Sequence, residues 1–149
     1  MASAVTSTRS AVKEGQVPLS NAGSPAPVAE ASAADDRRVL ARLDAIRAKE
    51  DRDLTWAPVT EKAIAAIFTS SQIVGTQLKA LECRATLCRM DAEHRSKLAA
   101  DSFGDVFPAL IPDFGSAYVA RSGDPQSGYK TTYYLARLGS HVINSAVQN

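Results

Sequence analysis

Apolar positions along this chain switch between helical spacing and strand-like alternation. Apolar residues at spacings of three and four predict helices over 36–50, 58–69 and 95–107. Alternation and β-forming residues predict strands over 73–83, 86–92, 116–121 and 129–136. The predicted order α-α-β-β-α-β-β therefore indicates an α+β fold, with one four-stranded antiparallel sheet and helices packed on one face.

Single residues indicate where some of these helices and strands begin, end or are interrupted. Ser96 is a good N-cap for the third helix, and Pro108 is expected to end or kink it. The alternation of the first strand is imperfect because Leu78 and Leu81 both favour burial, which allows a β-bulge. The tail over 140–149 is only weakly amphipathic, so we expect it to fray.

The first 34 residues have a different composition from the rest. Alanine, serine, threonine, glycine and proline dominate there, and no aromatic residue precedes Trp56. Such a segment cannot bury enough apolar surface to offset the entropy of ordering. We therefore expect a disordered arm over 1–34, which could be a tether to an anchor or export signal or simply a tail, and a single α+β domain over 35–149.

Charge and hydropathy limit the partners of this chain. The sequence carries 17 basic and 16 acidic residues, a formal net charge of +1, which disfavours nucleic acid as a partner. No apolar run approaches the roughly 20 residues that span a bilayer, so we expect no transmembrane segment in this chain. Its start lacks the basic region and apolar core of a signal peptide, although a signal or anchor could have been removed upstream.

The only two cysteines, Cys83 and Cys88, lie at the tip of the first predicted hairpin. A four-residue connection suits a hairpin whose base positions reach the spacing of a disulfide, which we predict here. Closing this loop removes entropy worth about 2 kcal/mol from the unfolded chain. A disulfide implies a periplasmic or secreted protein, whereas reduced cysteines would place it in the cytoplasm.

A metal site is the alternative for these cysteines. Cys83, Cys88 and His94 supply two thiolates and one imidazole within a short stretch. Zinc sites usually have two to four residues between the cysteines and a second pair of ligands. The fourth ligand would have to come from Asp91, Glu93 or His141.

The sequence offers few groups for catalysis, and we expect no cofactor. Its only histidines are His94 and His141, and it contains no nucleophile elbow, phosphate-binding loop or dinucleotide fingerprint. Catalysis by carboxylates alone stays open, because Asp101, Asp105 and Asp113 are close enough in sequence to line one cleft. This alternative is a small hydrolase that acts on an envelope polymer.

Tyrosine and arginine gather on the two predicted hairpins. Both residue types are enriched at protein interfaces, and rigid hairpins lose little entropy on docking. Alternating tyrosines can equally be half-buried residues of a sheet. We predict a non-catalytic, extracytoplasmic protein-binding module, an interaction or adaptor domain, with these candidate binding residues: Arg84, Arg89, Tyr118, Tyr129, Tyr133 and Arg137.

The segment from Glu82 to Arg89 resembles one found in a set of uncharacterised exported domains of proteobacteria. Those domains carry a similar Cys-Arg-x-x-x-Cys-Arg segment after a helix that opens near a tryptophan, as Trp56 does here. The resemblance covers roughly residues 54–92. It implies an exported protein with a disulfide, and it implies no activity.

Overall fold

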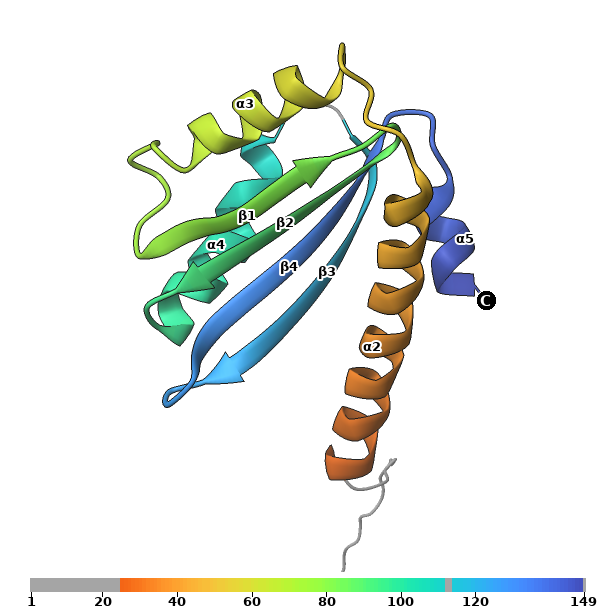
Figure 1. Cartoon of the computed structure of the whole chain (residues 1–149). Coiled ribbons are helices and arrows are strands. Elements are labelled where there is room, and N and C mark those ends of the chain that lie inside the picture. Colours follow the sequence, from red (N-terminus) through yellow and green to blue (C-terminus); the bar gives the residue numbers. More distant parts are fainter. Residues whose placement is uncertain (1–24, 112–113, 149) are drawn as a thin grey trace, which may run out of the picture. The chain divides into compact units, whose positions relative to one another are not determined.

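The computed structural model describes residues 25–111 and 114–148, with side chains from residue 33 onward. The chain divides into two compact units, Met1–Arg38 and Val39–Asn149. In the first unit, the described residues belong to a helix in which Arg38 pairs with Asp35. The elements in chain order are α2 (Pro25–Lys49), α3 (Ala57–Ile67), β1 (Thr76–Cys83), β2 (Leu87–His94), α4 (Lys97–Leu110), β3 (Phe114–Asp124), β4 (Gly128–Arg137) and α5 (Val142–Gln148) (Figure 1).

The predicted α+β fold and the order α-α-β-β-α-β-β are confirmed. The strands form one antiparallel sheet in the order β1-β2-β4-β3, so β1 and β3 are its edges (Figure 1). The register places Cys83 opposite Cys88 and shifts between Leu78 and Ala80, where the sequence allows a bulge. Both hairpins therefore form from neighbours in sequence, and the β2–β4 pairing joins them.

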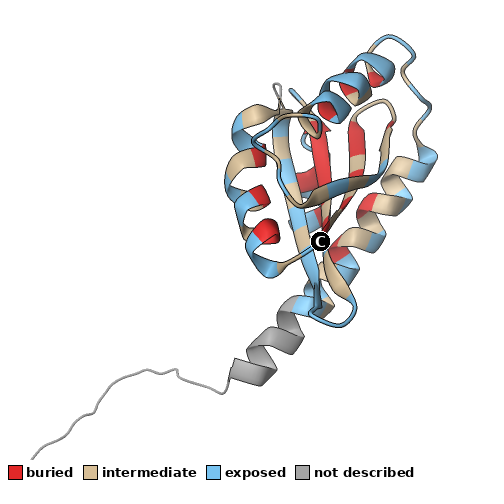
Figure 2. Cartoon of the chain, turned by 90° about the vertical axis from the view of Figure 1, so that its left-hand side faces the viewer, coloured by how far each residue is buried: buried red, intermediate tan, exposed pale blue. Residues whose placement is uncertain are grey.

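Helices cover both faces of the sheet, so the prediction that they pack on one face is wrong. On the first face, Met90 and Tyr133 form a core with Phe103 and Phe107 of α4. On the second face, Tyr134 packs with other buried residues of the second unit, namely Val39 and Leu43 of α2, Leu87, Ala136, and Ile143 and Ala146 of α5. Buried positions on strands and helices are red in Figure 2. Adjacent strand residues point to opposite faces, so a strand buried on both faces needs helices on both.

The described part of the chain is helical at both of its ends. Helix α2 begins at Pro25, inside the segment predicted to be a disordered arm, while residues 1–24 of that segment lie outside the described residues. The tail forms α5, in which Ile143 and Ala146 are buried. Arg42 of α2 also donates to the carbonyl oxygen of Ala146 at 2.8 Å. A seven-residue helix has little stability of its own, and packing on the sheet supplies the rest.

Helix α4 begins as predicted and ends later. Ser96 is its N-cap, and its hydroxyl oxygen accepts a hydrogen bond from the backbone N–H of Ala99 at 3.1 Å. Pro108 does not end the helix, which continues to Leu110. Pro108 therefore lies in the last turn, and the helix loses one hydrogen bond there because proline has no N–H to donate to the carbonyl oxygen four residues earlier.

His94 is buried on the first face of the sheet at the end of β2. Its Nδ1 lies 2.7 Å from the hydroxyl oxygen of Thr76, and its Nε2 lies 2.8 Å from that of Thr131. The ring also contacts Phe103, with 5.3 Å between ring centroids. Burial, together with the charge of Arg121, lowers the pKa of His94 below its ordinary value.

We expect His94 to make the protein less stable as the pH falls below about 6.5, the pKa of histidine in an unfolded chain. Below that pH the histidine of the unfolded chain binds a proton, whereas His94 in the folded protein stays neutral because its pKa is lower. The free energy of unfolding is therefore highest above about pH 6.5 and decreases as the pH falls toward the pKa of folded His94. Urea titrations across pH 5–8 test this. H94Q should flatten the dependence and the exposed H141Q should not, and equal slopes in all three proteins would contradict the assignment.

Candidate functional site

The Cys83–Cys88 disulfide is present at the tip of the first hairpin, as predicted. Both cysteines are fully buried, and the two residues are direct partners in the β1–β2 register. The backbone N–H of Arg84 donates to the carbonyl oxygen of Leu87 at 3.0 Å and closes the turn between the strands. The bond and the turn together hold the hairpin tip in one conformation.

Two other segments fold against this tip: the α2–α3 connection and the end of β4 (Figure 1). Glu50, which follows α2, accepts a hydrogen bond from the backbone N–H of Thr86 at 2.9 Å and a second from its hydroxyl. Arg84 donates to the Glu50 carbonyl oxygen at 3.1 Å. The N–H of Arg137, at the end of β4, donates to the Thr86 carbonyl oxygen at 2.8 Å. Three segments distant in sequence are thus joined by directed bonds.

Asp53 connects the α2–α3 connection to β4. One carboxylate oxygen accepts the backbone N–H groups of Thr55 and Trp56, at 2.9 and 3.0 Å. The other accepts Nη1 of Arg137 at 2.9 Å. The Trp56 N–H, Arg137 and Thr55 hold the pKa of Asp53 well below its usual range. The guanidinium of Arg137 also lies over the Trp56 ring, 4.8 Å from its centroid, a cation–π contact that orients both groups.

Arg52 and Glu61 close the edge of the sheet beside the disulfide. They form a two-point ion pair at 2.6 and 2.7 Å. Glu61 accepts the backbone N–H of Cys83 at 2.8 Å, and Arg52 donates to the Cys83 carbonyl oxygen at 3.0 Å. The hydrogen bond and charge of Arg52 lower the pKa of Glu61, which stays ionised in this position.

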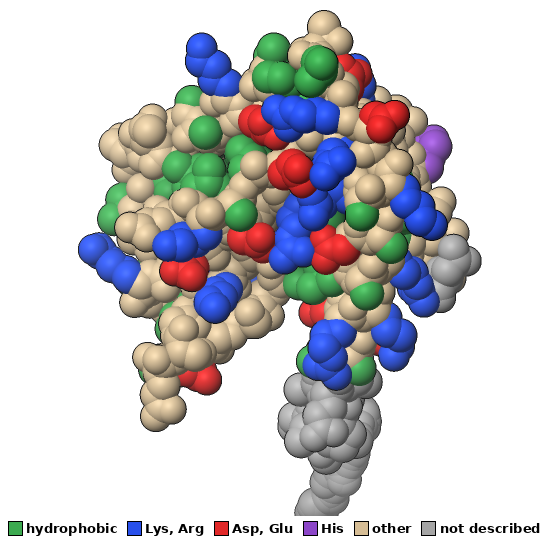
Figure 3. Space-filling view, in the orientation of Figure 1, with side chains coloured by type: hydrophobic (Ala, Val, Ile, Leu, Met, Phe, Trp, Pro, Cys, Tyr) green, Lys and Arg blue, Asp and Glu red, His purple; other side chains and the backbone are tan. Residues whose placement is uncertain are grey.

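Two large apolar side chains project from this rigid arrangement. Leu54 follows Asp53 and is 78% exposed, while Leu138 follows Arg137 and is 66% exposed. Because Asp53 binds Arg137, the segments that carry the two leucines are held together. We call the surface formed by Leu54, Trp56, Arg84, Arg137 and Leu138 the disulfide end. Figure 3 shows hydrophobic, basic and acidic side chains intermixed at the upper end of the view.

Arg89 belongs to a different group, a charged cluster on the second face of the sheet. Its Nη1 donates to both carboxylate oxygens of Asp44, at 2.8 and 2.7 Å, and its Nε lies 3.2 Å from Asp91. The Tyr134 hydroxyl donates to Asp44 as well. Burial, with that hydrogen bond, raises the pKa of Tyr134 to about 12. Burial opposes the charge on Asp44, yet hydrogen bonds from Tyr134 and Arg89 keep its pKa below the ordinary value.

A cleft of about 320 Å³ lies beside this cluster. Both signs of charge line it: Arg47 forms an ion pair with Glu82, and Arg89 is paired with Asp91. Each charge therefore already has a partner within the fold. Such a cluster fixes how α2 lies on the sheet, and its charges contribute more to specific packing than to net stability.

The structure does not bring the six predicted binding residues into one surface. Arg84 and Arg137 lie at the disulfide end. Arg89 and half-buried Tyr118 lie on the second face, where Tyr118 pairs with Tyr134. The other two residues are on β4: Tyr133 is 3% exposed in the core of the first face, and Tyr129 is near the opposite end of the sheet, opposite His94.

The structure does not bring together the three residues of the alternative metal site. Cys83 and Cys88 are bonded to each other, and both ring nitrogens of His94 are held by threonine hydroxyls. The hairpin also places His94 at the other end of β2, about 20 Å from Cys88 at the spacing of an extended strand. Among the described residues, no group of three or more histidines, cysteines and acids could hold a metal ion.

Of the three candidate catalytic acids, Asp101 and Asp105 lie on α4, and Asp113 lies outside the described residues. Asp101 accepts a hydrogen bond from Lys97 at 3.0 Å and one from Arg121 at 3.2 Å. These contacts, the Lys97 hydrogen bond foremost, lower the pKa of Asp101. A general acid needs a raised pKa, so the geometry gives Asp101 no support in that role.

Sequence reasoning did not identify Leu54 and Leu138 as functional. Each is a single leucine between polar or glycine neighbours, in Asp53-Leu54-Thr55 and Arg137-Leu138-Gly139. A lone leucine in a turn-like segment is a signal for exposure, but only the fold shows that the Asp53–Arg137 pair joins the two segments that carry these leucines.

No protein family, curated protein or solved structure matches this chain. Among the described residues, no helix combines the length and the apolar character needed to cross a bilayer.

Proposed function

We propose that this chain is a non-catalytic protein-binding module that docks its partner through the disulfide end. One observation carries the proposal: Leu54 and Leu138 are held exposed beside Trp56 and Arg137 on segments joined by Asp53. Tryptophan and arginine dominate binding energy at protein interfaces, and apolar side chains next to them can be desolvated on docking.

Rigidity favours binding at this surface. Association loses free energy when loops and long side chains must be ordered. Here the backbone of the hairpin tip is held by the disulfide and by Glu50, and the Arg137 side chain is held by Asp53 and by the Ala85 carbonyl oxygen at 3.1 Å. The arginines are also neutralised by carboxylates of the chain itself. We therefore expect a partner surface that is mainly apolar rather than strongly acidic.

We further propose that the module works outside the cytoplasm, in the periplasm or as a secreted protein. The disulfide supports this, because such bonds persist in oxidising compartments. The resemblance of the Cys-Arg-x-x-x-Cys-Arg segment to exported domains points the same way. Mass measurement after alkylation without reductant tests it, and two alkylated thiols in protein taken directly from its native cells would contradict it.

The docking surface is tested with L54D and L138D in pull-downs from envelope extract. Each substitution should weaken capture of the partner by about thirtyfold, which corresponds to a hot-spot loss of about 2 kcal/mol. The matched control is L98D, because Leu98 is 76% exposed on α4. All three variants should unfold within about 0.5 kcal/mol of the parent protein. Equal capture by all three would refute the disulfide end as the docking surface.

A further inference from the structure

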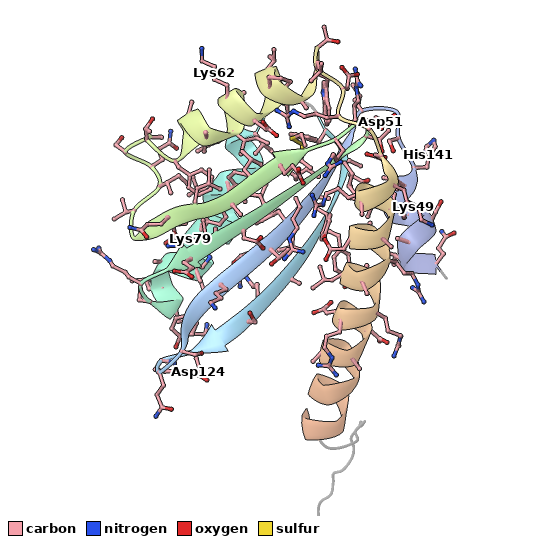
Figure 4. All side chains as sticks on the ribbon, in the orientation of Figure 1. Lys49, Asp51, Lys62, Lys79, Asp124 and His141 are labelled. Atoms are coloured by element: carbon pink, nitrogen blue, oxygen red, sulfur yellow. A yellow bond between two sulfur atoms is a disulfide. The ribbon has the colours of Figure 1, made fainter. Side chains whose placement is uncertain are left out.

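The two edge strands of the sheet, β1 and β3, differ in how far the rest of the chain covers them. Edge β1 has a bulge between Leu78 and Ala80, with Lys79 at the shift (Figure 4), and α3 packs against this strand. Arg52 and Glu61 also bond to the outer backbone groups of Cys83. These are features that prevent another strand from pairing. Edge β3 is an eleven-residue strand, and β4 pairs with it along one side. An extended chain could continue the sheet along this edge.

A groove of about 320 Å³ runs beside β3 on the first face of the sheet. One wall is α4, where Gly104 and Pro108 share a side of the helix, together with Ile111, the C-cap of α4. The other wall is β3, where Ala117 and Val119 face the groove and Val119 is 41% exposed. The groove is therefore apolar at the Pro108–Ile111 end.

Its other end is charged. Arg121 donates to the Ala100 carbonyl oxygen at 2.9 Å and to Asp101 at 3.2 Å, so this guanidinium already has partners. Asp105 lines the same end of the groove. The charge offered to an incoming side chain there is consequently the carboxylate of Asp105, which favours a basic residue.

We propose that β3 binds an extended peptide segment of a partner protein as a fifth strand of the sheet. The segment places a bulky apolar side chain in the groove between Val119 and Pro108, and the next side chain on that face is a lysine or arginine directed at Asp105. The outer backbone groups of β3 supply the hydrogen bonds, and the groove supplies the sequence preference. This site is separate from the disulfide end and does not depend on the function proposed for it.

A second copy of this chain is the other possible occupant, and the groove disfavours it. In an antiparallel pairing of β3 with β3 of a second copy, the second copy would present Ala117, Val119 and Arg121 on the side of the groove. Ala117 and Val119 are too small to fill the groove, and the Arg121 guanidinium is already held by Asp101 and the Ala100 carbonyl oxygen rather than directed at Asp105. An interface that leaves such a void loses packing energy.

The probe is a bead library of eight-residue peptides in which apolar and polar residues alternate, with one lysine or arginine at varied positions. The most tightly bound peptide should slow amide hydrogen exchange in β3 and not at the disulfide end. V119K should weaken its binding by about tenfold or more, because a charged side chain on an edge strand blocks strand addition. The matched control is V59K, since Val59 is 69% exposed on α3 and should leave binding unchanged. The same peptide with proline at alternate positions should not bind, because proline cannot donate to a ladder.

Four results would overturn the proposal. These are an absence of binders at millimolar peptide, binding that protects no β3 amide, equal binding of the proline peptide, and equal binding by V119K. A dimer that V119K converts to a monomer would assign the edge to a second copy instead. A peptide weakened by L54D but not by V119K would belong to the disulfide end, so failure of one surface can be told from failure of the other.

Discussion

Replacing Leu43 with alanine should destabilise the folded domain by about 2–5 kcal/mol, the usual cost of deleting a buried leucine side chain. Leu43 is fully buried in the second face of the sheet, in the cluster that contains Leu87, Tyr134 and Ile143. Truncation leaves a cavity that these neighbours can fill only in part, so lost dispersion contacts add to the lost hydrophobic burial.

Urea denaturation measures this effect, and L54A is its matched control. Leu54 has the same side chain but is mostly exposed, so its truncation should change the free energy of unfolding by less than about 0.5 kcal/mol. The comparison tests whether α2 and α5 cover the second face. If L43A were as stable as L54A, that face would not be a core, and the two-sided packing in Figure 2 would be wrong.

Replacing Tyr133 with alanine should cost about 3–5 kcal/mol, as for other large aromatic side chains in cores. The ring lies 5.0 Å from the Phe107 ring and 5.9 Å from the Phe103 ring, measured between centroids, and it is almost completely buried. Its removal would open a cavity between β4 and α4. Y133F keeps the ring and these contacts, so it should cost less than about 1.5 kcal/mol.

This pair of variants separates folding from binding at a position that the sequence suggests for binding. Thermal unfolding gives the stability of each variant, and pull-downs are then compared at a temperature where both are folded. Y133A should unfold at a clearly lower temperature, yet once folded it should capture the partner as the parent protein does. A stable Y133A that no longer binds would show that Tyr133 contacts the partner and would place the docking surface elsewhere.

Local pattern is enough to predict most of the elements and both hairpins of this protein. The spacing of Ile64, Ile67 and Phe68 marks α3, and Ser96 marks the start of α4, because helix geometry and capping act over a few residues. The sequence also predicts the Cys83–Cys88 bond, since the hairpin that joins the cysteines is formed by neighbours in the chain.

The assignment of faces depends on pairing that spans the whole chain. Tyr133 and Tyr134 are adjacent and chemically identical, yet one contacts α4 and the other contacts Asp44 of α2. The alternation of side chains along a strand shows that they point to opposite faces of the sheet, but it does not show that a helix packs on each face. Helix α5 is unpredicted for the same reason, because its seven residues are held by contacts with the sheet rather than by their own propensity.

The candidate docking surface is likewise decided only by the tertiary structure. Leu54 and Leu138 lie far apart in sequence, and the Asp53–Arg137 pair joins the segments that carry them. Exposure depends on what the remainder of the chain leaves uncovered, and no local pattern encodes that. Figure 4 shows Asp51 and Asp124 at opposite ends of the sheet. The sequence alone shows neither which of these two ends is the disulfide end nor which edge of the sheet stays open. Local chemistry determined which elements form, and the need to bury both faces of the sheet determined which side chains were left exposed.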